Sequence, residues 1–149
     1  LPSWEQDGAR FRLIAGEVMG HRSAVPVHSP LYLLEVSTTQ GATIRIGEHL
    51  FGESGLYILE GAVIDDGVEH GPRQLLVAKD SGQCSFHLSP GSTVYLFGGE
   101  PFPEERFIYW NFVATSPERL EAAKQRWKDR AFPMIEGEHD LVPLPGTGW

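Results

Sequence analysis

The sequence contains little of what disulfides, zinc sites and nucleic-acid surfaces require. Cys84 is the only cysteine among 149 residues, so no disulfide can form within the chain and no cysteine cluster can hold zinc. Lysine and arginine number 12 against 20 aspartates and glutamates, which gives a formal net charge of −8. Because a field of that sign repels a phosphate backbone, we expect no direct binding to nucleic acid.

Long apolar runs are lacking as well. No run approaches the ~20 residues that cross a bilayer, and no charged and then apolar signal segment stands at the start. We therefore expect no membrane association. A lone cysteine suits a reducing compartment, so we expect a cytoplasmic protein. The first residue, Leu1, is not methionine, which leaves open a processed chain or a piece of a longer polypeptide.

The chain is instead rich in residues that divide it into short elements. Its 17 glycines and 11 prolines are scattered rather than clustered, which favours short strands joined by tight turns over a helical bundle. Short apolar runs, rich in β-branched and aromatic side chains, lie between these breaks. The runs begin at Arg10, Leu31, Ala42, Leu56, Ala62, Gln74, Gln83, Thr93 and Arg106. This spacing predicts an all-β fold, either a sandwich of two antiparallel sheets or a jelly-roll barrel.

Turn signals and composition suggest how the chain is divided. We expect tight turns at Asp65-Asp66-Gly67 and Asp80-Ser81-Gly82, because each offers a glycine where the turn needs a positive φ. Residues 1–9 are polar, contain proline and glycine, and are expected to form an N-terminal linker. Residues 10–133 then form a single domain, and residues 134–149 an extended tail.

One amphipathic helix is predicted over residues 117–130. The segment Thr115-Ser116-Pro117-Glu118 supplies a hydroxyl cap, a proline in the first turn and a carboxylate at the positive end of the helix dipole. Leu120, Ala123, Trp127 and Ala131 share one face. We expect this face to pack Trp127 against the sandwich.

Three stretches in this order resemble the pirin family of cupins. The first is RLIAGEVMGHRSAV, residues 12–25, and the second is GLYILEGAV, residues 55–63. The third and most specific is LFGGEPFPEERFIYWNFVATSPERLEAAKQRW, residues 96–127, which contains a GGEP turn, a strand ending in phenylalanine and valine, a hydroxyl cap and a terminal helix. Nearly the whole chain is similar to the C-terminal half of the family.

The resemblance implies a cupin-type jelly-roll β-sandwich or barrel with one C-terminal amphipathic helix. Pirins are two-domain cupins whose N-terminal domain binds a metal, usually iron, through three histidines and a glutamate. The C-terminal cupin generally lacks these ligands. Some members show quercetin 2,3-dioxygenase activity and others act as transcriptional co-regulators. The resemblance therefore implies no catalytic residue, no metal and no cofactor in this chain, with iron held in an N-terminal domain.

The candidate ligand residues are too few for a metal site. A metal-bearing cupin needs imidazole nitrogens from neighbouring strands and one carboxylate, but the segment from Gly47 to Glu53 contains a single histidine, His49. Glu53 is suitably spaced for the carboxylate. His87 could supply a third group by pointing into the barrel, or could be half-exposed and hydrogen-bonded in place. We keep His49, Glu53 and His87 as possible pocket-lining residues, with ordinary surface roles as the alternative.

For the other potentially reactive or ligand-binding residues, we expect structural roles. Cys84 lies in a predicted strand with no readable partner, so packing is favoured over a nucleophilic role. His21 lies in a polar segment and is expected to be solvated. The aromatic cluster Phe107, Tyr109, Trp110 and Phe112 is expected to pack against the helix that carries Trp127 or against another domain, with a ligand platform as the alternative.

Three functions remain open on the sequence alone. The leading hypothesis is a structural and interaction half of a two-domain cupin, whose partner is an N-terminal cupin domain. Self-association through an uncovered apolar patch, giving a homodimer, would follow if that partner were missing. The alternatives are a free-standing single-cupin dioxygenase that uses His49, Glu53 and an unidentified third ligand, and a cupin that binds a small molecule without catalysis.

Overall fold

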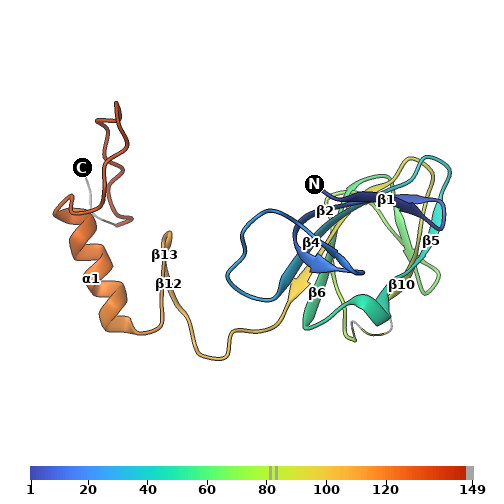
Figure 1. The fold of residues 1–149 in the computed structure, drawn as a ribbon, viewed down its shortest axis with the longest axis horizontal. Helices are drawn as coiled ribbons and strands as arrows, with labels where there is room; N and C mark the ends of the chain where they lie inside the picture. The colour runs from blue at the N-terminus through green and yellow to red at the C-terminus, as the bar shows by residue number, and fades with distance from the viewer. Residues whose placement is uncertain (81, 83, 147–149) are drawn as a thin grey trace. The chain divides into compact units, whose positions relative to one another are not determined.

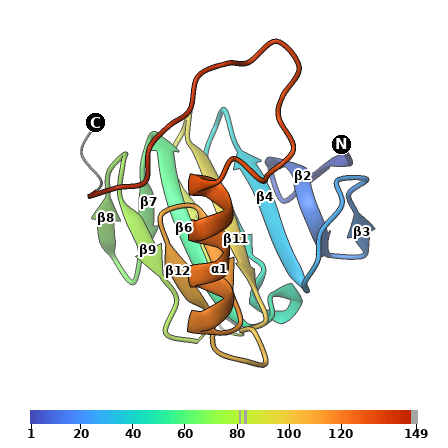
Figure 2. The same cartoon turned by 90° about the vertical axis from the view of Figure 1, so that its left-hand side faces the viewer.

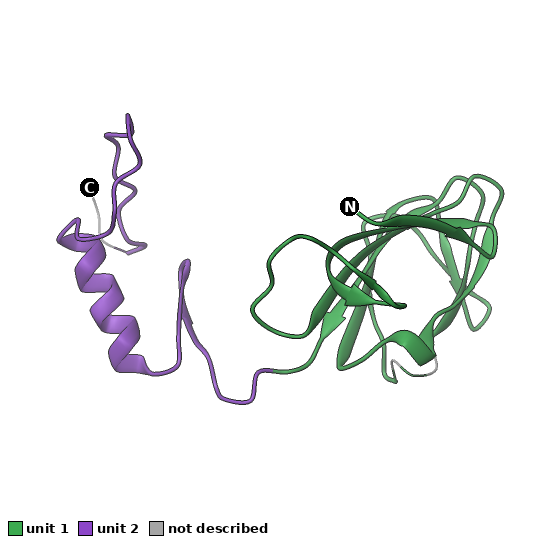
Figure 3. Ribbon diagram, in the orientation of Figure 1, with its two compact units in different colours: residues 1–101 green, residues 102–149 purple. Residues whose placement is uncertain are grey.

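The computed structural model describes residues 1–80, 82 and 84–146. The chain divides into two compact units, Leu1–Pro101 and Phe102–Trp149 (Figure 3). The predicted single domain over residues 10–133 therefore spans a boundary after Pro101. No helix among the described residues is long and apolar enough to cross a membrane.

The first unit is built from two antiparallel sheets (Figure 1). The larger sheet has seven strands in the order β1-β2-β4-β11-β6-β9, with β3 paired to β2. These are β1 (Ser3–Gln6), β2 (Ala9–Val18), β3 (His21–Arg22), β4 (Leu31–Ser37), β6 (Glu53–Glu60), β9 (Leu75–Val77) and β11 (Thr93–Gly99). Figure 2 shows β2, β4, β11, β6 and β9 side by side.

The smaller sheet has four strands in the order β5-β10-β7-β8. These are β5 (Ala42–Arg45), β7 (Val63–Asp65), β8 (Val68–His70) and β10 (Ser85–Leu88), and a short 3-10 helix, η1 (Gly47–His49), follows β5. Ser81 and Gln83, which belong to a turn and a strand predicted from the sequence, lie outside the described residues.

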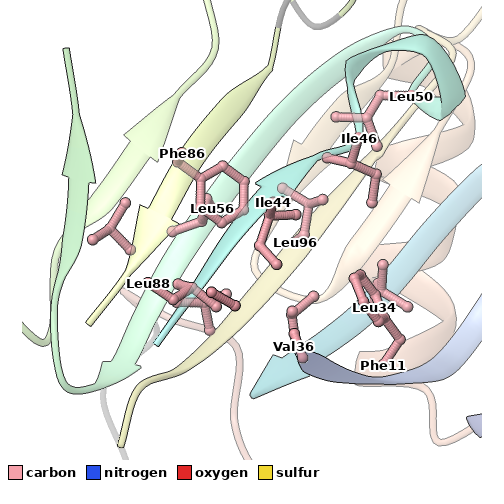
Figure 4. Close-up of a cluster of buried hydrophobic side chains, with 14 of the residues drawn as sticks. Phe11, Leu34, Val36, Ile44, Ile46, Leu50, Leu56, Phe86, Leu88 and Leu96 are labelled. Atoms are coloured by element: carbon pink, nitrogen blue, oxygen red, sulfur yellow. The ribbon is translucent and has the colours of Figure 1, made fainter. Parts of the chain in front are cut away.

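Alternation of buried and more exposed side chains along the strands creates the core between the sheets. In β4 the side chains of Tyr32, Leu34 and Val36 are buried, whereas their neighbours in the strand are half-buried. Successive strand residues point to opposite faces, so one face of each sheet contributes to a shared apolar interior. Figure 4 labels Phe11, Leu34, Val36, Ile44, Ile46, Leu50, Leu56, Phe86, Leu88 and Leu96 in this interior. The two-sheet arrangement predicted from the spacing of the runs is present.

The predicted N-terminal linker is wrong, because residues 3–6 form strand β1. Strand β1 pairs with β2 in antiparallel register, and Trp4 lies opposite Phe11. The connecting residues are Asp7 and Gly8, with φ values of 52° and 80°. An Asp-Gly pair with both φ values positive forms the two-residue turn whose twist matches a β-hairpin. The polar composition concealed this hairpin, although the Asp-Gly pair signalled it.

A second turn of the same kind confirms a prediction. Asp66 and Gly67 connect β7 to β8 with φ values of 46° and 78°. The turn brings Asp65 opposite Val68 in the register of the hairpin. As a result, Asp65 stands at the end of β7, on the same face as the buried Val63.

The second unit contains a hairpin and the helix. Strands β12 (Phe107–Tyr109) and β13 (Phe112–Ala114) pair with each other, whereas the sequence predicted one continuous run from Arg106. Trp110, in the connecting turn, has a φ of 54°, which is unusual for a bulky residue.

Helix α1 (Pro117–Lys128) begins where it was predicted and ends two residues early. The Ser116 side chain accepts a hydrogen bond from the Arg119 N–H at 3.4 Å. At the other end Arg130 has a φ of 53°, and the Ala131 N–H donates to the Arg126 carbonyl at 2.8 Å. A left-handed residue with this hydrogen bond terminates a helix, so Ala131 lies outside the helix and its apolar face.

The tail predicted from residue 134 onward is fastened to the rest of the second unit. The Trp127 Nε1–H donates to the Val142 carbonyl, and the Tyr109 hydroxyl donates to the Pro145 carbonyl, each at 2.8 Å. Leu144 is buried. Residues up to 146 therefore belong to the unit that contains the helix, and residues 147–149 of the predicted tail lie outside the described part of the chain.

Candidate functional site

The three residues singled out from the sequence lie on three different elements, η1, β6 and β10. His49 ends η1 and is exposed, and its Nε2 lies 3.5 Å from Oε1 of Glu48. Glu53 is exposed at the start of β6, where it precedes the inward-facing Ser54. Both side chains are exposed, and neither is among the residues that line the cavity described below, so their pocket-lining role stays a prediction.

His87 lies on the outside of the smaller sheet. Its neighbours Phe86 and Leu88 are buried, and alternation therefore turns His87 outward. The imidazole Nδ1 shares a hydrogen bond of 3.1 Å with the hydroxyl of Thr43, its partner across the β5–β10 pair. His87 therefore does not point into the barrel; it is hydrogen-bonded on the outer surface, which was the second of the two alternatives.

These positions do not fit an iron ion. Among the described residues, no group of three or more histidine, cysteine, aspartate or glutamate side chains lies close enough to hold a metal. A cupin metal site requires side chains that converge inside the barrel, but His49, Glu53 and His87 are all exposed. We therefore derive no reaction step through a metal in this chain.

The structure instead forms a cavity of about 570 Å³ between the two sheets of the first unit. Its apolar walls come from inward-facing residues of five strands. These are Leu56 of β6, Val63 of β7, Leu76 of β9, Phe86 of β10 and Leu96 of β11. A cavity of this size is in the range of small-molecule sites.

Polar groups enter this cavity at a few points. Ser54 is buried and lines the cavity, and its hydroxyl lies 2.5 Å from the hydroxyl of the buried Tyr32. Burial raises the pKa of the Tyr32 phenol; the hydrogen bond with Ser54 opposes this shift and nearby Cys84 adds to it. The polar pair is therefore held in its neutral form.

Cys84 also lines the cavity, two residues before the inward-facing Phe86. Burial raises the pKa of its thiol, and the negative charge of Asp65 raises it further. Both effects favour the thiol over the nucleophilic thiolate. The structure thus agrees with the packing role expected for Cys84 and adds Asp65 as a neighbour.

Tyr32 occupies its place because a glycine faces it. A Cβ atom added to Gly98 of β11 would overlap the Tyr32 hydroxyl and the carbonyl of Glu53. Gly98 lies opposite both Tyr32 of β4 and Ser54 of β6. The glycine therefore allows the Tyr32 hydroxyl to reach Ser54 across the intervening strand.

The outer face of the larger sheet carries a second notable surface. Phe97 lies between Leu33 and Gly55 in the register, and Gly55 lies opposite Val77. We call the apolar face the set Leu33, Tyr57, Leu59, Leu75, Val77, Tyr95 and Phe97. Leu75 and Val77 are 55% and 73% exposed, so large aliphatic groups stand in solvent on this face.

The aromatic cluster of the second unit has its partners within that unit. Trp110 and Phe112 both contact Trp127 edge to face, at centroid distances of 5.2 and 6.0 Å. Phe112 also stacks on Phe132 at 5.9 Å. The cluster thus packs against the helix, as one of the alternatives predicted. Trp127 makes aromatic contacts with Trp110, Phe112 and Phe132, which all belong to the second unit.

Two facing antiparallel sheets followed in sequence by a hairpin and one helix are the architecture expected of a cupin with a C-terminal helix. In agreement, a crystal structure of quercetin 2,3-dioxygenase from Acinetobacter baumannii matches with a TM-score of 0.82 at 29% identity, over 99% of this chain and 51% of that one. A second Acinetobacter baumannii structure of quercetin 2,3-dioxygenase matches with a TM-score of 0.69 at 21% identity, over 86% of this chain and 45% of that one. The predicted cupin fold with one C-terminal helix is confirmed.

The chain belongs to the pirin family, and residues 33–133 match the model of the pirin C-terminal cupin domain. A pirin-like protein from Caulobacter vibrioides is 39% identical over 97% of this chain and 50% of its own length. A protein provisionally named quercetin 2,3-dioxygenase from Pseudomonas aeruginosa is 31% identical over 100% of this chain and 49% of its own length. The chain thus spans about half the length of these relatives.

Proposed function

We propose that this chain is the structural and interaction half of a two-domain cupin, and that its apolar face docks onto a second cupin domain. The observation that carries the proposal is this face, whose Leu59, Leu75 and Val77 are large exposed apolar residues of the first unit. Half of the length of the Caulobacter relative has no counterpart in this chain, which supports a second domain as the occupant.

The chemistry of the face supports a protein partner over solvent. Exposed apolar groups concentrate at the β6 and β9 side of the sheet, whereas the β2 and β4 side carries an ion pair between Arg12 and Glu35 at 2.5 Å. Contiguous exposed apolar surface bounded by charge is typical of interaction sites. Oxygenase chemistry or transcriptional co-regulation would then reside on the second domain, which would hold the iron. A cytoplasmic location suits the single thiol.

A pair of matched substitutions tests the docking. Val77→Asp places a charge on the apolar face, and Val68→Asp places the same charge on β8, the edge strand of the other sheet. Both valines are exposed, at 73% and 55%. We expect the 149-residue chain to self-associate in sedimentation velocity, and Val77→Asp but not Val68→Asp to abolish the association.

A second measurement uses the half of the Caulobacter relative that this chain does not match. We expect the purified half to bind the chain in a one-to-one complex, and Val77→Asp to prevent it. The proposal is overturned if the chain is monomeric at every concentration and does not bind the purified half of the relative. It is also overturned if Val77→Asp weakens neither the self-association nor the binding to that half. We also expect well below one equivalent of transition metal in the purified chain by elemental analysis. Stoichiometric iron, zinc or nickel would overturn the assignment of the metal to the second domain.

A further inference from the structure

The cavity between the two sheets is not used by the docking face. The apolar part of its walls is formed mainly by inward-facing residues, whereas the apolar face points outward from the larger sheet; Val77, at the end of β9, borders both. The register of β7 and β10 brings Val63 opposite Leu88 and Ile64 opposite His87, so Asp65 comes next to Phe86 at the end of the pair. An exposed acidic side chain thus lines the same cavity as the apolar residues Leu56 and Phe86.

The interior of the cavity also contains a polar group. Ser54 lines the cavity, and its hydroxyl is hydrogen-bonded to that of the buried Tyr32. Apolar walls with a few convergent polar groups are the usual composition of a small-molecule site.

The charges at the opening decide which molecules are accepted. The cavity is lined by three aspartates, Asp65, Asp66 and Asp80, against one lysine, Lys79. The chain as a whole has a net charge of −8. An anion approaching the opening is therefore repelled, whereas a cation is attracted and can be held near a carboxylate with its apolar part against Leu56 and Phe86.

From this geometry we infer that the cavity binds a small organic cation with an apolar body, such as an arylalkyl amine. The ammonium group lies at Asp65, and the body fills the space between Leu56, Val63 and Phe86. Binding requires no metal and no reaction, and the body of the ligand contacts inward-facing residues rather than the apolar face, with Val77 at the border of the two surfaces. The inference gives this half of the cupin a ligand site of its own.

The test is an NMR titration of the full chain with 2-phenylethylammonium chloride, and with 3-phenylpropionate as the anionic counterpart of similar size. We expect the amine to shift the resonances of Leu56, Val63 and Phe86 in a saturable manner, and the carboxylate to leave them unchanged. Both titrations are performed at the same ionic strength, because salt weakens attraction between exposed charges.

Two variants of one hairpin separate a site from general attraction to an acidic protein. Asp65→Asn removes the charge at the opening and keeps the shape of the side chain. Glu69→Gln removes one charge from β8, where Glu69 lies opposite Ile64 and is exposed. We expect Asp65→Asn to weaken amine binding about fivefold, and Glu69→Gln to leave it nearly unchanged.

Three results would overturn the inference. The first is an amine titration that moves no resonance of the cavity walls. The second is binding of 3-phenylpropionate as tight as that of the amine, which would assign the cavity to anions. The third is an equal effect of Asp65→Asn and Glu69→Gln, which would mean that the amine responds to net charge alone. The thermal midpoint of each variant without ligand is measured in parallel, so that a loss of folding is recognised.

Discussion

The indole ring of Trp4 stacks on the imidazole ring of His21, with centroids 3.9 Å apart and planes within 14°. Trp4 also stacks on Phe11, with ring centroids 5.4 Å apart. These three rings come from β1, β3 and β2. The stack therefore fastens the N-terminal strand to the edge of the larger sheet, and His21 is a packing residue rather than the solvated one expected from the sequence.

Replacing Trp4 by alanine should destabilise the first unit by about 2 kcal/mol, which is less than a fully buried tryptophan would lose. The physical reason is the loss of both stacking contacts and of the apolar area that Trp4 covers. Urea unfolding followed by circular dichroism measures the change. Leu1→Ala is the control, since Leu1 is exposed. Equal effects of the two substitutions would show that the stack contributes nothing.

The buried hydroxyl pair of Tyr32 and Ser54 should behave as one unit. Tyr32→Phe leaves the buried Ser54 hydroxyl without this partner and should destabilise the chain by about 1–2 kcal/mol. Removing both hydroxyls in Tyr32→Phe/Ser54→Ala should cost less than the sum of the two single changes, because no unpaired group then remains. Unfolding free energies of the four proteins give the coupling. Strict additivity would count against a hydrogen bond between the two side chains.

The Cys84 thiol should react slowly with iodoacetamide and should require a higher pH than a free cysteine. Burial is the larger cause of the raised pKa of this thiol, and the negative charge of Asp65 is the smaller one. The thiolate is therefore scarce at neutral pH. Asp65→Asn removes the second cause and should raise the alkylation rate about two- to fivefold at a fixed pH. The rate is followed by mass spectrometry, with Glu69→Gln as the control. A lower rate in Asp65→Asn would contradict the assigned cause.

Much of the first unit could be predicted because local patterns and tertiary structure agree there. The run that begins at Leu31 alternates as a strand does, and Asp66-Gly67 has the chemistry of its turn. Strand β1 escaped prediction because its polar residues form an edge strand, although Asp7-Gly8 is the same turn signal. The single run predicted from Arg106 breaks at Trp110, whose positive φ no propensity would favour.

The candidate site was only partly readable from the sequence. Counting the possible ligand residues from Gly47 to Glu53 needs no structure, and the expectation that they are too few for a metal remains a prediction. The cavity could not be predicted in the same way, because it depends on the register of β7 against β10. That register brings Asp65 near Cys84, and no spacing along the chain specifies it.

The start of helix α1 gives a prediction that depends on pH. The pKa of Glu118 is lowered, first by a hydrogen bond from its own backbone N–H and second by one from the Ser116 hydroxyl. A carboxyl group with a lowered folded-state pKa stabilises the helix above its unfolded-state pKa, and this contribution disappears as the pH falls through the lowered value. Helicity measured by circular dichroism should therefore decline on acidification, and Glu118→Gln should flatten this decline. Ser116→Ala removes the cap as well and should destabilise the helix by about 1 kcal/mol at neutral pH. An acid decline that persists unchanged in Glu118→Gln would assign it to other carboxylates.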